Sequence, residues 1–164
     1  MMGIRRHHLL LIVLMIIACA FPAYCGGRSE VVGKGIRNAD ITEFWYTYST
    51  SANPPEFQRY RFYSANDGWH FYHERREGNH WPLSESDITV SGDTLITQDQ
   101  LESLFSFLEG GTVKARGSSA ESGSSGPWLY LYWTGDRSKY QEFSFSSYSD
   151  RLGFEELCRN LAGL

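Results

Sequence analysis

Three consecutive runs of alternating aromatic and polar residues, within residues 41–75, constrain the fold more than any other feature of the chain. Aromatic and β-branched residues at alternate positions are typical of strands that bury one face. Pro54-Pro55 separates the first run from the second. Asn66-Asp67-Gly68 separates the second from the third, and these residue types tolerate the positive φ of a tight turn. The pattern predicts three strands, the last two forming a hairpin.

The rest of the chain predicts two helices and four more strands. Thr97 and Gln100 form a capping box before an apolar stripe, and Gly110-Gly111 favours a left-handed helix end. Ser149 or Asp150 is the expected cap of a last helix over about residues 151–162. The further strands are expected around residues 88–90, 112–116, 128–134 and 140–145.

These elements define one fold class. Residues 41–164 are expected to form a single α+β domain, with a mostly antiparallel twisted sheet of about six or seven strands and two helices packed on it. The length of 164 residues suits one domain. Residues 117–127 are rich in Ser and Gly, which predicts a surface loop in that domain.

The first 19 residues predict export. Arg5 and Arg6 precede an unbroken apolar run of ten residues, 9–18, as in a signal peptide. Removing this leader leaves 13 basic against 19 acidic residues, a net charge near −6. A weakly acidic domain lacks the basic surface that nucleic-acid binding needs, so no nucleic-acid partner is expected.

The end of the leader resembles a bacterial lipobox. Ile16-Ile17-Ala18-Cys19 has the branched residue, the small residue and the Cys of that signal, which implies lipidation of Cys19 and attachment to the outer side of the cell membrane. Two alternatives stay open: cleavage after Ala20 to give a secreted protein, and an uncleaved anchor over residues 9–25.

Residues 20–40 predict a flexible tether, since residues 26–40 are polar and glycine-rich. Cys25 lies in this segment, whereas Cys158 falls on the apolar stripe of the last helix. Export permits a disulfide between the two, but the helical position favours a buried free thiol.

The layout resembles that of small exported lipoproteins of Gram-positive bacteria whose function is uncharacterised. The resemblance implies a location in the cell envelope and no particular chemistry. The pieces that carry it are Cys19, Phe44–Tyr48, Asp67-Gly68, Leu101–Leu108, Trp128–Asp136 and Phe154–Leu161.

No catalytic or cofactor signature is found in the sequence. His70 and His73 lie an odd number of residues apart, so on one strand they point to opposite faces and cannot share a metal ion. We therefore expect no cofactor, no metal site and no enzymatic activity. A small hydrolase with dispersed carboxylates, such as Glu74 and Asp87, stays an alternative.

The 25 aromatic residues favour a binding or scaffolding protein. The expected partner is an envelope protein, with a glycan- or peptidoglycan-binding surface of exposed aromatics as the alternative. An interaction surface is predicted at the hairpin, although arginine stems that merely cover aromatic rings would give the same pattern. Its predicted residues are Arg59, Arg61, Tyr63, Trp69, His70 and Tyr72.

Overall fold

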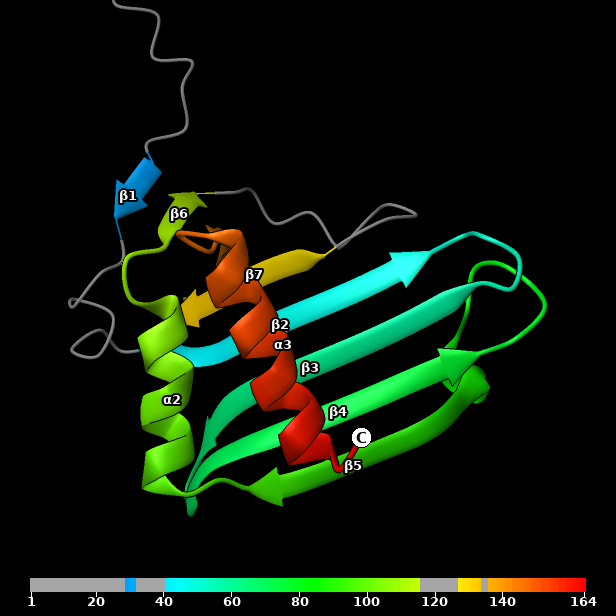
Figure 1. The fold of residues 1–164 in the computed structure, drawn as a ribbon, viewed down its shortest axis with the longest axis horizontal. Coiled ribbons are helices and arrows are strands. Elements are labelled where there is room, and N and C mark those ends of the chain that lie inside the picture. Colours follow the sequence, from blue (N-terminus) through cyan, green and yellow to red (C-terminus); the bar gives the residue numbers. More distant parts are fainter. Residues whose placement is uncertain (1–28, 32–40, 116–126, 134–135) are drawn as a thin grey trace, which may run out of the picture.

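The computed structural model describes residues 29–31, 41–115, 127–133 and 136–164. In these residues one antiparallel sheet has the strand order β1-β6-β8-β7-β2-β3-β4-β5, and two α-helices pack on it (Figure 1). The predicted single α+β domain is confirmed. The strands are β1 (Ser29–Val31), β2 (Ile41–Thr50), β3 (Glu56–Ala65), β4 (Gly68–Glu77), β5 (Ile88–Leu95), β6 (Thr112–Ala115), β7 (Trp128–Trp133) and β8 (Asp136–Ser144).

Three parts of the sequence-based interpretation lie wholly or largely outside the described residues. These are the leader with Cys19, most of the segment 20–40 and most of the loop 117–127. Within the predicted tether, residues 29–31 form β1, which pairs with β6. This short strand was not predicted, because its partner lies more than 80 residues away and no local pattern marks it.

Both helices begin at side-chain caps. Helix α2 (Gln98–Leu108) has the predicted capping box, in which Thr97 Oγ1 accepts from the Gln100 amide and Gln100 Oε1 accepts from the Thr97 amide. Helix α3 (Tyr148–Ala162) begins earlier than predicted, because Ser147 rather than Ser149 or Asp150 is the cap. A 3₁₀ turn, η2 (Glu85–Asp87), precedes β5.

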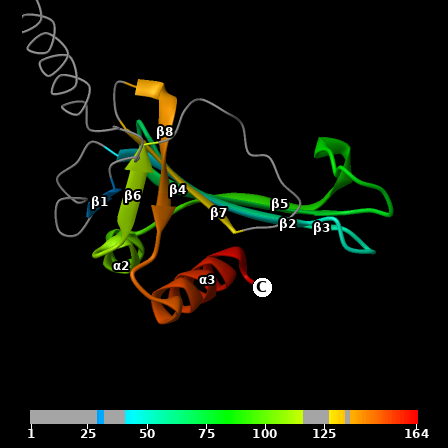
Figure 2. The same ribbon diagram turned by 90° about the horizontal axis from the view of Figure 1, so that it is seen from above.

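The core lies between the sheet and the two helices, which cover the same side of it (Figure 2). Phe44, Phe62 and Phe71 project from neighbouring strands towards Leu104 of α2 and Phe154 of α3, and all five are at most 1% exposed. Cys158 is a buried free thiol, as its place on the helical stripe favours. Strand β7 lies inside the sheet, as its two apolar faces predict.

Gly153 lets the two helices approach each other. A Cβ atom at this position would lie 2.6 Å from Cε1 of Phe107 in α2, closer than two non-bonded carbon atoms approach. The glycine therefore leaves room for the Phe107 ring where α3 passes α2. In Figure 1 strands β2 to β5 continue past α3 towards the β2–β3 and β4–β5 connections. Among the described residues, no helix combines the length and the apolar composition needed to cross a membrane.

Candidate functional site

The predicted interaction surface is largely assembled on the face of β3 and β4 that points away from the helices, here called the open face. The strand register places Arg61 beside Tyr72 and Tyr63 beside His70 on this face. Trp69 is the exception and corrects the prediction. It shares its face with Phe71, two residues along the strand, and its ring lies 6.0 Å from that of Phe105 in α2.

The cations of the open face are paired within it. Arg61 binds Glu43 with an Nη2–Oε1 distance of 3.0 Å, and its guanidinium carbon lies 4.4 Å from the Tyr63 ring centroid. Arg59 lies over Trp45 at 4.7 Å. The Arg59 and Arg61 side chains are 20% and 31% exposed, so they are half-buried rather than fully solvated. Stacking of arginine on aromatic rings accounts for this face without a ligand.

Glu74 is the centre of a buried polar network on the open face. Its Oε1 accepts from Nη2 of Arg76 at 2.6 Å, and its Oε2 accepts from the Tyr72 hydroxyl at 2.6 Å. Arg59 Nη1 lies 3.5 Å from Glu74 Oε1. Burial, followed by this hydrogen bond to Glu74, raises the pKa of Tyr72 to about 12. With all these partners, and at only 4% exposed, Glu74 lacks the access to water that a hydrolytic carboxylate needs.

The second acid considered for hydrolysis, Asp87, is also held by its neighbours. Asp87 Oδ2 accepts from the backbone amide of Ser84 at 2.6 Å and from the Ser84 hydroxyl at 2.8 Å, and these two hydrogen bonds lower the pKa of the carboxyl group. His80 Nε2 lies 3.1 Å from its other oxygen. No group of three or more His, Cys, Asp or Glu side chains in the described part of the chain is placed to hold a metal ion.

The two histidines of β4 have opposite surroundings, as their odd spacing predicts. On the open face His70 lies between Asp93 and Asp67, at 2.9 and 3.0 Å, and hydrogen bonding to these carboxylates raises its pKa. On the helix side His73 is 8% exposed, and its Nδ1 has no hydrogen-bond partner. Burial lowers the pKa of His73.

These shifts predict opposite effects on stability. The folded pKa of His73 lies below its ordinary value of 6.5, so the unfolded chain is protonated first and the free energy of unfolding falls as the pH drops below 6.5. His70 contributes stability that is fully present below 6.5 and is lost as the pH rises through its raised folded pKa. Urea unfolding from pH 8 to 5 is the measurement. His73→Phe should flatten the acid decline and His70→Asn should steepen it; identical profiles for both variants would contradict the assignment.

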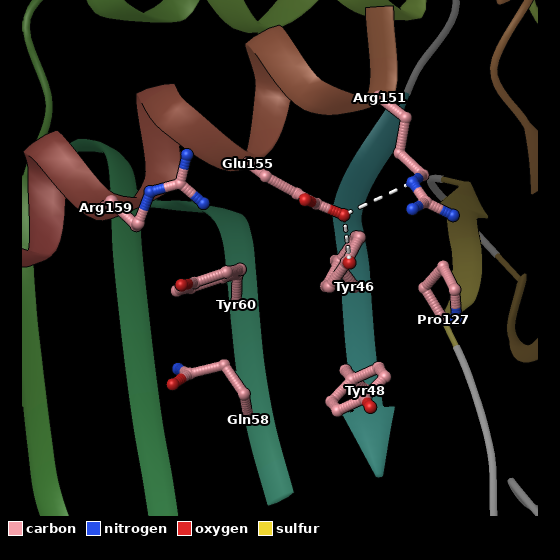
Figure 3. Close-up of a pocket in the computed structure, with 8 residues that line it drawn as sticks. All are labelled: Tyr46, Tyr48, Gln58, Tyr60, Pro127, Arg151, Glu155 and Arg159. Atoms are coloured by element: carbon pink, nitrogen blue, oxygen red, sulfur yellow. Dashed lines mark hydrogen bonds and ion pairs between the residues drawn. The ribbon is translucent and has the colours of Figure 1, made fainter. Parts of the chain in front are cut away.

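A groove between α3 and the sheet is the second candidate site, and sequence reasoning did not identify it. Figure 3 shows its first hollow, of about 340 Å³. A second hollow of about 290 Å³ shares Tyr48, Gln58, Tyr60 and Arg159 with the first and so extends the groove. The first hollow is lined by Tyr46, Tyr48, Gln58, Tyr60, Pro127, Arg151, Glu155 and Arg159.

The groove arises because β2 and β3 become more polar along the same face. Near α2 the facing pair is Phe44 and Phe62, next come Tyr46 and Tyr60, and then Tyr48 and Gln58. The members of the first two pairs are at most 6% exposed, whereas Tyr48 is 38% exposed. The alternating sequence of β2 predicted that Phe44, Tyr46 and Tyr48 lie on one face of the strand. Along this face phenylalanine gives way to tyrosine towards the place where the helices stop covering the sheet.

Glu155 is the one carboxylate among the residues lining the first hollow, and it is already paired. It accepts from the Tyr46 hydroxyl, and Arg151 Nε lies 3.3 Å from its Oε1 (Figure 3). Burial, and then this hydrogen bond, raise the pKa of Tyr46 well above its ordinary value. The lining of this hollow therefore does not contain the two facing carboxylates of a glycosidase.

Several polar groups in the groove have no hydrogen bond or ion pair within the described part of the chain, and the Tyr48 hydroxyl is one of them. Arg159 is exposed and its guanidinium makes no hydrogen bond or ion pair there; the Tyr60 hydroxyl likewise has no partner there. Tyr60 is 6% exposed, and burial raises its pKa to about 12, so its hydroxyl is a hydrogen-bond donor at neutral pH. A ligand in the groove would meet both.

Comparison of the chain with protein-family models, with curated proteins and with solved structures gave no match.

Proposed function

We propose that this protein is an exported, lipid-anchored binding protein that holds a saccharide chain in the groove between α3 and the sheet, without catalysing a reaction. The tyrosine floor of the groove is the observation that carries the proposal. Tyr46, Tyr48 and Tyr60 follow one another across β2 and β3. Tyr48, at 38% exposed, presents its ring, whereas Tyr46 and Tyr60 are at most 6% exposed. A tyrosine ring packs on the C–H face of a sugar while its hydroxyl and nearby side chains bind the sugar hydroxyls.

The position of the groove favours a saccharide over an extended peptide. A peptide that pairs with a sheet needs an exposed strand edge, where unpaired amide and carbonyl groups continue the hydrogen-bond ladder. Here β2 and β3 lie inside the sheet, with both edges paired, and only their side chains face the groove. Charged side chains also line the first hollow, namely Arg151, Glu155 and Arg159, and an apolar ligand such as an acyl chain would offer them no partner.

The binding proposal predicts that Tyr48→Ala weakens attachment to polysaccharide by about 3- to 10-fold, the size of one lost aromatic contact. Tyr48 is 38% exposed, so the change leaves the core intact. The measurement is co-sedimentation of the full chain, purified in detergent, with insoluble peptidoglycan and with chitin. Trp81→Ala is the control, since Trp81 is 41% exposed and does not line the groove. If neither polysaccharide is bound, or if Trp81→Ala alone abolishes binding, the proposed site is wrong.

Anchoring is tested separately from binding. The lipobox-like sequence ending at Cys19 predicts that Cys19→Ala releases the protein from the membrane or blocks its processing. Metabolic labelling with a fatty-acid probe, followed by membrane fractionation, is the measurement. Cys25→Ala is the matched control and should remain labelled. A wild-type protein that carries no label and begins at Phe21 would show ordinary cleavage after Ala20.

A further inference from the structure

We infer that the groove selects saccharides that carry a carboxylate group, which is bound by the guanidinium of Arg159 and the hydroxyl of Tyr60. This inference rests on the proposed function, because it names the ligand class of the same groove. It depends on three features: one cation without a counter-ion, one hydroxyl that borders the hollow without an acceptor, and an aromatic ring beside them.

The charges of the first hollow are unequal. Arg151 and Glu155 neutralise each other, at 3.3 Å between Nε and Oε1. Arg159 has no ion pair among the described residues, so the lining of the first hollow carries one unmatched positive charge. The second hollow adds Glu56 and Arg75, whose charges are opposite in sign. Arg159 is exposed to the hollow and to solvent, and arginine binds carboxylates with particular geometric fit. One unmatched charge suits a carboxylate better than a phosphate monoester, which carries nearly two at neutral pH.

Tyr60 is the second donor. Tyr60 is 6% exposed. Its hydroxyl faces the hollow and has no partner among the described residues. Figure 3 shows Tyr60 and Arg159 at the same end of the pocket, away from the pair formed by Arg151 and Glu155. Because the hydroxyl borders the hollow, a ligand oxygen there can accept a hydrogen bond from it.

Two neighbours supply contacts for the rest of a sugar. Gln58 Nε2 donates to the backbone oxygen of Glu74 at 2.9 Å, so its Oε1 is left as an acceptor for a sugar hydroxyl. Tyr48 lies opposite Gln58 in the register and offers an exposed ring. Together with the two donors, these groups match a sugar ring bearing one carboxylate: an anion at one end, a C–H face, and hydroxyls at the edge.

Arg159 also lies in the last turn of α3, where a positive charge stabilises the helix end. If Arg159 had only this structural role, the affinity of the groove for a ligand would not depend on whether the ligand carries a carboxylate. The experiment must therefore compare two ligands that differ in this group alone.

The test is titration calorimetry of the detergent-purified full chain with trigalacturonic acid, with its methyl ester and with chitotriose. We expect the acid to bind at least about 10-fold more tightly than the ester, the size of one charge-assisted hydrogen bond. Arg159→Gln should abolish this difference and leave affinity for the ester unchanged. Tyr60→Phe, which keeps the ring, should weaken binding of the acid by about 3- to 10-fold. Arg61→Gln makes the same charge change on the open face and should have no effect.

The outcomes separate this inference from the proposed function. If the ester or chitotriose binds as tightly as the acid, or if Arg159→Gln weakens acid and ester equally, the carboxylate inference is wrong and saccharide binding stands. If none of the three trisaccharides binds, the proposed function fails together with the inference.

Discussion

Replacing Phe154 with alanine is expected to lower the free energy of unfolding by about 3–5 kcal/mol. Phe154 is 0% exposed and lies at the centre of the aromatic core. Its ring centroid is 5.4 Å from that of Phe44, 5.6 Å from that of Tyr46 and 6.0 Å from that of Phe62. These rings come from β2 and β3, so the cavity would open where α3 is fastened to the sheet.

Urea denaturation of wild type and variant is the measurement. Leu152→Ala, two residues away on the same helix, is the control, because Leu152 is 42% exposed and its truncation should change the free energy of unfolding by less than about 1 kcal/mol. Equal losses for the two variants would mean that α3 does not pack through Phe154. Because α3 forms one wall of the groove, Phe154→Ala should also weaken polysaccharide binding.

Glu74→Gln is expected to destabilise the protein by about 2–4 kcal/mol, even though it lies on the open face. The change keeps the shape of the side chain but removes the charge that Arg76 and Arg59 bind. The side chains of Glu74 and Arg76 are 5% and 10% exposed, so the arginine would be left buried without its counter-ion. A buried cation without a partner is strongly unfavourable.

Glu77→Gln provides the matched control in thermal or urea unfolding. Glu77 pairs with Arg75 on the same strand, with Nη2 and Oε1 2.5 Å apart, but both side chains are about half exposed, at 47% and 51%. Solvent screens such a pair, so its loss should change the free energy of unfolding by less than about 1 kcal/mol. A larger effect for Glu77 than for Glu74 would contradict the view that burial sets the strength of this network.

The open face and the groove differ in whether their charges are satisfied. On the open face Arg61 pairs with Glu43, and Arg76 pairs with Glu74. In the groove Arg159 and the Tyr60 hydroxyl are unpaired within the described residues. Charged and polar side chains that already have partners stabilise the fold, whereas those without partners beside a hollow are available to bind a ligand. This contrast is why we place the binding site on the helix side rather than on the face that the sequence first indicated.

Features governed by neighbours in the chain could be predicted from the sequence. The capping box joins Thr97 and Gln100, three positions apart, and the Asn66-Asp67-Gly68 turn has positive φ at Gly68, so both depend on local chemistry. Alternation correctly separated His70 from His73. The same rule, applied from the buried Phe71, would have assigned Trp69 to the helix side, where it packs.

The groove could not be predicted in this way, because its two walls are about 100 residues apart in the chain. Tyr60 and Gln58 come from β3, and Arg159 comes from α3. Helical periodicity indicates that Phe154 and Cys158 face the core, but not which strands they will cover or where the cover ends. That position follows from long-range packing, with Gly153 against Phe107 and Phe154 among rings of two strands. The local sequence thus determines the elements and their buried faces, while the packing of α3 across the sheet determines which tyrosines remain accessible to a ligand.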